Sequence, residues 1–183
     1  MQQTKQTRQL IIVGILSGIS FILMFLKFPL PFLPPYLTLD FSDVPALLAT
    51  FTLGPVAGLL VELIKNLLNF FFYLADPIGP IANFIAGASL LLTAYTIFRH
   101  KQTTRSMIIG LSVGTLIMTL ILSIMNYFVL LPLYGMIMNL SDIATNLKVI
   151  ITAGIIPFNI IKGLVVSILF ILLYRRLKNV LKI

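Results

Sequence analysis

The chain has 183 residues, of which 59% are hydrophobic and 10% are charged, and its mean hydropathy is +1.08. Soluble domains are roughly 45–50% apolar and about 25% charged, so this composition indicates an integral membrane protein. The length fits one membrane domain covering residues 1–183, and we expect no attached ATPase or second enzyme module.

Several kinds of site are excluded by the residue types that the sequence lacks. It has no cysteine, and His100 is its one histidine, so we expect neither a disulfide framework nor a metal site. The net charge of +8 does not indicate a nucleic-acid partner, because the 13 lysines and arginines bracket apolar segments and form no basic stripe.

Six apolar runs follow one another along the chain. Four of them are about 20 residues or longer, which is enough to cross a hydrocarbon core roughly 30 Å thick. The first is marginal, and we interpret it as a retained span because no small-x-small cleavage pattern follows it. The second is too short to cross alone. The predicted spans are residues 10–26, 44–53, 55–74, 78–98, 107–131 and 149–174.

The short second run has helix boundaries of its own. Ser42 and Asp43 are candidate caps at its start, and Gly54 with Pro55 breaks the chain at its end. If this run joined the third in one kinked helix, the basic loop 99–105 would face outward, against the positive-inside rule. We therefore predict an all-α integral membrane bundle of six transmembrane helices, with the N- and C-termini and this loop in the cytoplasm.

Pairs of small residues four positions apart recur in three spans. Such pairs let helix backbones approach closely in lipid, where packing drives helix association. We expect the pair in the first span to contact another protein and the others to serve internal packing. No repeat or inverted symmetry is visible, which argues against a self-sufficient carrier. The pairs are Gly14 and Gly18, Gly54 and Gly58, and Gly110 and Gly114.

Amide and amine side chains gather toward the outer ends of the predicted spans. The inner halves of these spans carry only hydroxyl groups, so we expect a polar chamber open to the outside above an apolar floor. A channel needs polar lining through its whole depth, whereas such a chamber suits the capture of a small solute. The outer polar residues are Asn69 with Asn66 and Lys65 just beneath it, Asn83, Asn126, Asn159 and Lys162.

Each of these polar residues also has a purely structural interpretation. Lys162 can extend its ammonium to the outer headgroups along its apolar stem. Glu62 and Lys65, one helical turn apart, are better explained as a structural ion pair than as a proton relay. A single asparagine in a membrane often bonds a neighbouring helix, but five at similar depth favour a shared ligand.

The outward loop between the first two spans, residues 27–43, carries four prolines and several aromatic residues. Proline restricts the unfolded chain, so we expect a semi-rigid lid with Phe32, Tyr36 and Phe41 facing a ligand or lipid. Tyr36, Thr38 and Asp40 alternate, which places them on one face of an extended segment.

These segments closely resemble the riboflavin-specific substrate-binding subunits (S components) of energy-coupling factor (ECF) vitamin transporters. The resemblance rests on the proline-rich outer loop, the small-xxx-small first span, the basic loop after the fourth span and the segment FSDVPALLATFTLGPVAGLLVELIKNLLN. It implies a multi-pass protein of the bacterial cell membrane that binds riboflavin from outside. It also implies a transmembrane coupling protein and two cytoplasmic ATPases as partners, with Gly14 and Gly18 at the docking face.

The resemblance further implies that Tyr36, Thr38 and Asp40 contact the flavin, with Asp43 nearby, and that Asn126 and Lys162 do so too. The depth pattern adds Asn83 and Asn159 to this predicted riboflavin site. A carboxamide can accept from the flavin imide N–H while donating to the adjacent carbonyl. Flavin mononucleotide (FMN) is a second candidate ligand, if Lys27 or Lys148 reaches the mouth. No Walker A motif is present, so energy for uptake must come from partners.

Two alternatives stay open. One is an S component for another small neutral or zwitterionic vitamin. The other alternative is a membrane enzyme of lipid or cofactor metabolism, which would need paired acids near the membrane for a metal ion. Glu62 has no second intramembrane carboxylate in the sequence, and Asp40 with Asp43 lies in a loop, so we predict that the chain is not an enzyme.

Overall fold

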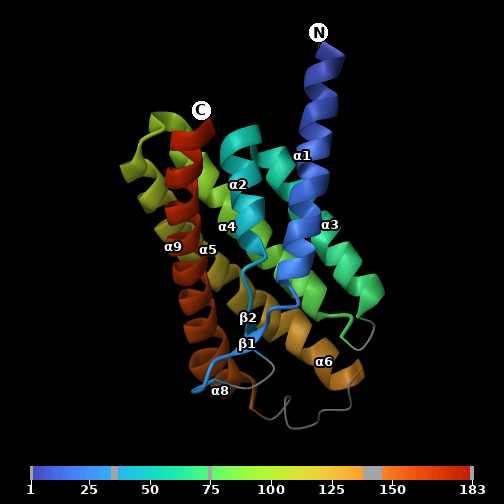
Figure 1. The fold of residues 1–183 in the computed structure, drawn as a ribbon. Coiled ribbons are helices and arrows are strands. Elements are labelled where there is room, and N and C mark those ends of the chain that lie inside the picture. The colour runs from blue at the N-terminus through green and yellow to red at the C-terminus, as the bar shows by residue number, and fades with distance from the viewer. Residues whose placement is uncertain (1, 34–36, 74–75, 138–145, 182–183) are drawn as a thin grey trace.

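The computed structural model describes residues 2–33, 37–73, 76–137 and 146–181, and most of these residues are helical (Figure 1). Six helical stretches occur in these residues in the predicted order. The first four are α1 (Gln2–Leu23), α2 (Asp43–Leu53), α3 (Pro55–Phe72) and α4 (Gly79–Lys101). The fifth runs from α5 (Thr104–Met125) through η1 (Asn126–Leu130) into α6 (Leu131–Ile137). The sixth runs from α8 (Leu147–Val149) through η2 (Ile150–Ile155) into α9 (Ile156–Leu181).

Five of these stretches are long and apolar enough to cross a membrane, counted over the described residues, and α2 is the shorter sixth. Both chain ends lie at one end of the bundle, together with the turn between α4 and α5 (Figure 1). We call this the terminal end, and the other the opposite end. An even number of passes explains the shared position of the termini. That the terminal end faces the cytoplasm stays a prediction, supported by the basic residues of this turn, Arg99, Lys101 and Arg105.

Helix α2 spans only part of the bundle. Its 11 residues are about 16 Å long, roughly half the thickness of a hydrocarbon core. It occupies the half nearer the terminal end, and an extended segment leads into it from the opposite end (Figure 1). Gly54 then turns the chain with φ 107°, which favours glycine, and Pro55 begins α3. The second pass is therefore helical in one half and extended in the other.

The extended segment contains a short antiparallel ladder that the sequence patterns did not predict. Strand β1 (Phe28–Pro29) pairs with β2 (Thr38–Leu39), which places Phe28 opposite Leu39. The predicted cap at Ser42 is also corrected. Ser42 stands at the N-cap position of α2, but its side chain makes no capping bond and its hydroxyl donates to Asp40 instead.

Two prolines lie inside helical stretches, and the fifth stretch continues beyond the predicted span end at residue 131. The fifth stretch continues through Pro132 to Ile137, and Pro157 is the second residue of α9. A π-helical turn precedes each proline: the Leu131 N–H donates to Asn126 O, and the Ile156 N–H donates to Ile151 O. Each bond joins residues five apart instead of four. The α-helical hydrogen-bond pattern is therefore interrupted just before the proline, which has no N–H to donate.

Aromatic rings fill the half of the bundle near the terminal end. Phe51 of α2 lies 4.7 Å from Phe98 of α4 and 4.8 Å from Phe170 of α9, measured between ring centroids. Tyr174 packs on Phe170 at 5.4 Å. This packing agrees with an apolar floor beneath any chamber at the opposite end.

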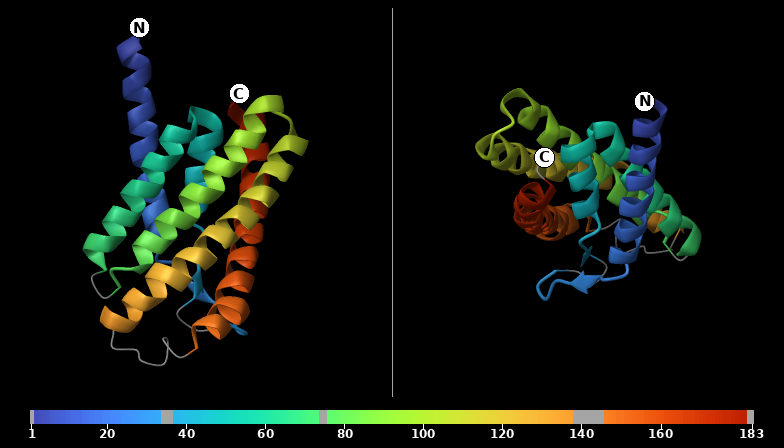
Figure 2. Two further views of the ribbon diagram at one scale, coloured as in Figure 1. Left: turned by 180° about the vertical axis from the view of Figure 1, so that it is seen from behind. Right: turned by 45° about the horizontal axis from the view of Figure 1, so that its top comes forward.

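Helices α4 and α5 run side by side along most of their length (Figure 2). A capping box between Thr103 and Ser106 starts α5 after the tight turn. A Cβ atom at Gly110 would lie 2.5 Å from the backbone oxygen of Ala94, so glycine permits this close approach. The predicted internal packing role of this glycine is confirmed.

We expect Gly110→Ala to lower the free energy of unfolding by about 1–3 kcal/mol, because the backbone of α4 must move to admit a methyl group. Gly14→Ala on α1 is the matched control, since a Cβ there meets nothing within 4 Å. The control should leave stability within about 1 kcal/mol of the parent protein. Thermal unfolding in detergent, followed by circular dichroism, measures both. Equal stability of the two variants would contradict the close approach.

Candidate ligand-binding site

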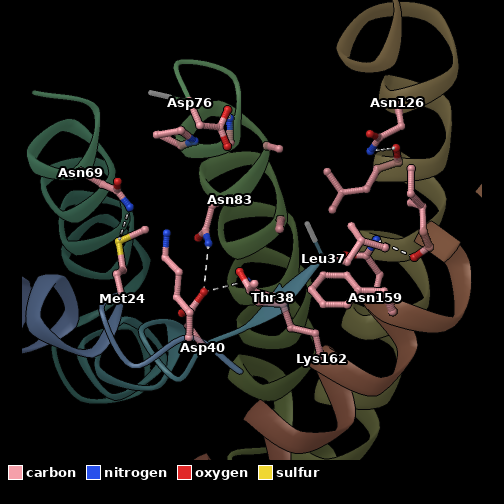
Figure 3. A pocket seen from close by; sticks show the side chains of 18 of the residues that line it. Met24, Leu37, Thr38, Asp40, Asn69, Asp76, Asn83, Asn126, Asn159 and Lys162 are labelled. Atoms are coloured by element: carbon pink, nitrogen blue, oxygen red, sulfur yellow. Dashed lines mark hydrogen bonds and ion pairs between the residues drawn. The ribbon is translucent and has the colours of Figure 1, made fainter. Parts of the chain in front are cut away.

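A cavity of about 560 Å³ lies at the opposite end of the bundle, where α2 is missing (Figure 3). This volume is within the range of roughly 300–1,000 Å³ that is usual for small-molecule sites. Side chains of β2, α3, α4, α5, η1, α6, η2 and α9 line it, together with Met24 and Lys27, which follow α1. Its apolar surface comes from residues such as Met24, Leu122, Leu131 and Phe158.

Four of the five asparagines that the depth pattern selected line this cavity, whereas Asn66 is buried and does not line it. Asn126 donates one amide N–H to Leu122 O at 2.8 Å, and Asn159 donates to Ile155 O at 2.8 Å. Each bond holds the amide against its own helix and leaves a second N–H and the carbonyl oxygen for a ligand. Asn83 donates to Asp40 Oδ2 at 3.4 Å, and Asn69 donates to the sulfur of Met24 at 3.5 Å.

Lys162 and Asp40 face each other across the cavity wall (Figure 3). The Lys162 Nζ lies 3.9 Å from Asp40 Oδ2, and each residue is only 3% exposed. Lys162 therefore does not extend to the headgroups, and this structural alternative is wrong. Asp40 is also held by the Ser42 backbone N–H, which donates to its Oδ1 at 2.9 Å.

A second pair of charged residues lies nearer the edge of the cavity. Lys27 stands over the ring of Tyr73, with 5.1 Å between Nζ and the ring centroid. Asp76 accepts from the Gly79 N–H at 2.9 Å and from the hydroxyl of Tyr134 at 2.8 Å. Among the described residues, the charged side chains that line the cavity are thus two lysines and two aspartates, whose formal charges cancel. This balance suits a neutral ligand better than an anion.

Most of the predicted site residues meet at this cavity. Thr38, Asp40, Asn83, Asn126, Asn159 and Lys162 all line it. Asp43 does not: it is 1% exposed and lies behind the wall, where it pairs with Lys65 and Lys162. Tyr36 lies outside the described residues. The ligand contacts themselves stay predictions.

The predicted docking glycines of α1 and two aromatic residues of the predicted lid do not line the cavity. Gly14 and Gly18 lie on α1 away from it, and a Cβ at either would meet nothing within 4 Å. Phe32 is 96% exposed, and Phe41 packs on Phe28 with 5.8 Å between ring centroids. Neither phenylalanine is a lining residue.

The sequence interpretation missed several lining residues, including Tyr73, Asp76 and Tyr134. A signal for Asp76 was present, because an acidic side chain just before a helix start with Pro80 in its first turn is typical of an N-terminal cap. Tyr134 had no such signal, since it lies beyond Pro132, where the span was expected to end.

Glu62 and Lys65 form the predicted ion pair, with 3.0 Å between Glu62 Oε2 and Lys65 Nζ. Both side chains are fully buried. Among the residues that the structure describes, no group of three or more histidine, cysteine, aspartate or glutamate side chains is arranged to hold a metal ion.

The chain is similar over nearly its whole length to known transport proteins. It is 68% identical over 178 residues to the riboflavin transporter RibU of Staphylococcus aureus (strain TCH60), covering 97% of this chain and 94% of that one. It is 42% identical to the riboflavin transporter FmnP of Bacillus subtilis (strain 168), covering 94% and 93%. The solved structure of the S component of a bacterial ECF transporter matches with a TM-score of 0.87 at 64% identity, covering 97% of this chain and 99% of that one.

Residues 8–174 match the family model of the ECF transporter substrate-specific component. This match includes every cavity-lining residue and all of the helical stretches except the outermost turns of α1 and α9. The chain is a multi-pass membrane protein and belongs to the substrate-specific components of ECF transporters, a family of transport subunits and not of enzymes.

Proposed function

We propose that this protein captures riboflavin from the extracellular side of the membrane in the cavity at the opposite end. One observation carries the proposal: Asn126, Asn159 and Lys162 line the same cavity as Thr38 and Asp40. Relatives that are 68% and 42% identical over nearly the full chain are riboflavin transporters, which supports the same ligand here.

The chemistry of the flavin ring fits this set of groups. The pyrimidine edge of the ring offers an imide N–H between two carbonyl oxygens, which matches the free N–H and carbonyl oxygen of Asn126. Lys162 donates to a remaining carbonyl or ring nitrogen. Thr38 and Asp40 serve the ribityl hydroxyls, and apolar lining such as Phe158 and Leu122 accepts the dimethylbenzene end.

The predicted partners follow from the family. An S component of this kind works with a transmembrane coupling protein and two cytoplasmic ATPases, and the chain itself has no Walker A motif. Helix α1 is the best docking surface for the coupling protein. Its Gly14 and Gly18 are uncovered, and Ile11 and Ile15 beside them are 57% and 58% exposed.

We expect purified protein in detergent to quench riboflavin fluorescence on titration and to unfold at a higher temperature with the ligand. Stabilisation should reach about 2.7 kcal/mol at a ligand concentration one hundred times the Kd. FMN and other vitamins, including thiamine pyrophosphate, form the comparison panel. Absence of riboflavin binding at micromolar ligand would refute the proposal, and tighter binding of another vitamin would reassign the ligand.

Asn126→Ala should weaken riboflavin binding by about 1–3 kcal/mol, because polar groups of the buried ligand edge lose their partner. This corresponds to a rise in Kd of about 5- to 150-fold. The matched control is Thr96→Ala, which removes an exposed hydroxyl that donates to Leu92 O in the part of α4 near the terminal end. An unchanged Kd for Asn126→Ala in the same titration would remove this residue from the site.

Gly14→Leu and Gly18→Leu should leave riboflavin binding intact but abolish uptake of labelled riboflavin by cells that also express the coupling protein and ATPases. Bulky side chains there prevent close approach of a partner helix. Leu120→Phe, at a position of α5 that is 60% exposed, is the control for added bulk in lipid. Normal uptake by both glycine variants would exclude this face as the docking surface.

A further inference from the structure

A cluster of charged side chains lies directly behind the cavity wall. We call Asp43, Glu62 and Lys65 the rear cluster. None of the three lines the cavity, and their exposed fractions are 1%, 0% and 0%. The two charged residues in front of them, Asp40 and Lys162, do line it. The rear cluster therefore cannot touch a ligand, yet it borders the charged groups that can.

Asp43 joins the rear cluster to Lys162. One carboxylate oxygen, Oδ1, accepts from Lys65, and the other, Oδ2, lies 3.1 Å from Lys162 Nζ. Lys65 is at the same time 3.0 Å from Glu62 Oε2. Asp43 is thus shared between two ammonium groups, and Lys65 supplies the positive charge on the side away from the cavity.

Ser42 joins Lys65 to the second charged group of the cavity. Its hydroxyl accepts from Lys65 Nζ at 2.9 Å and donates to Asp40 Oδ1. Its backbone N–H donates to the same oxygen. Lys65 consequently borders both Asp40 and Lys162 through a single intermediate residue in each case.

The balance of buried charges indicates how Lys65 affects the position of the Lys162 ammonium. With Lys65 present, two ammonium groups share Asp43, Glu62 and Asp40. Without Lys65, whether or not Glu62 is neutralised with it, Lys162 is the one cation of this group left to pair with Asp43. Leaving a buried charge without a partner is costly at low dielectric, so the Lys162 ammonium would be drawn toward Asp43 and away from a ligand.

We propose that Lys65, held by Asp43, Glu62 and Ser42, is a positioning residue for ligand binding: because it shares Asp43 with Lys162, the Lys162 ammonium keeps an N–H directed into the cavity. This inference rests on the proposed binding of riboflavin. It assigns a function in recognition to a residue that never contacts the ligand. It also explains why a lysine with no access to the cavity is buried completely in a membrane-spanning helix.

The test is a cycle of four proteins: the parent, Glu62→Gln/Lys65→Met, Lys162→Met, and the triple variant. The Glu62→Gln/Lys65→Met pair removes one anion and one cation together, so the net charge of the cluster is unchanged. Neutral replacement of a whole buried ion pair is usually tolerated by the fold. Riboflavin Kd values are measured by fluorescence quenching, and thermal unfolding reports stability separately.

We expect the paired substitution to raise the riboflavin Kd roughly tenfold or more when Lys162 is present, and less than about twofold in the Lys162→Met protein. A purely structural role would give the same change in both backgrounds, and this result would overturn the proposal. Thr115→Val is the control for loss of a buried polar group, since Thr115 is 3% exposed and bonds only Leu111 O of its own helix. It should leave the Kd unchanged.

The outcomes separate this inference from the proposed function. Failure of the parent protein to bind riboflavin refutes the proposed function, whereas normal binding by the paired variant refutes only the role of Lys65. If the paired variant does not fold, Glu62→Gln/Lys65→Gln keeps a hydrogen-bonding side chain at each position and is judged by the same comparison.

Discussion

The shared carboxylate of Asp43 is the contact on which the arrangement of the opposite half depends. It stands at the first residue of α2 and between two buried lysines, Lys65 of α3 and Lys162 of α9. Without an anion between them, two ammonium groups at this depth would repel each other in a medium of low dielectric. Asp43 therefore fixes three passes of the chain at one level. Beyond this level the second pass is extended, and the space that further turns of α2 would fill is the cavity.

The amide side chains that line the cavity need hydrogen-bond partners within the membrane even when no ligand is bound. Asn126 and Asn159 each bond a carbonyl of their own helix, so neither depends on a neighbouring helix for its partner. Asn126 also begins the π-helical turn η1, whose wider backbone precedes Pro132. Such turns are frequent at functional sites. The polar lining is thus held locally, while the apolar lining closes around it.

The parts of this site that sequence patterns predicted are those that depend on single residues. The cost of placing an amide or ammonium group in hydrocarbon applies residue by residue, so depth alone identified Asn83, Asn126, Asn159 and Lys162. The start of α2 was also predicted from single residues, because Ser42 and Asp43 indicate a helix boundary without reference to the rest of the fold. Asp43 was expected near the ligand. Its pairing with Lys65 could not be predicted, because it depends on which helices are neighbours in the fold. The bond between Tyr134 and Asp76, 58 residues apart, likewise has no local pattern. The π-helical turns were missed because proline ordinarily indicates a helix end.

Helix α1 is attached beside the cavity at one end and carries the proposed docking face along its length. Near the opposite end it is anchored: the Ser20 hydroxyl donates to Ser42 O at 2.8 Å, and Phe21 packs on Phe72 with 5.5 Å between ring centroids. Toward the N-terminus it extends past the rest of the bundle (Figure 1), and the face with Gly14 and Gly18 is uncovered. The anchor at Ser42 is the residue that also holds Asp40 at the cavity. Helix α1 is therefore held by Ser20 and Phe21 near the cavity, and its uncovered face with Gly14 and Gly18 lies nearer the terminal end. This is the division that a subunit requires if it binds solute at one membrane surface and a partner along its side.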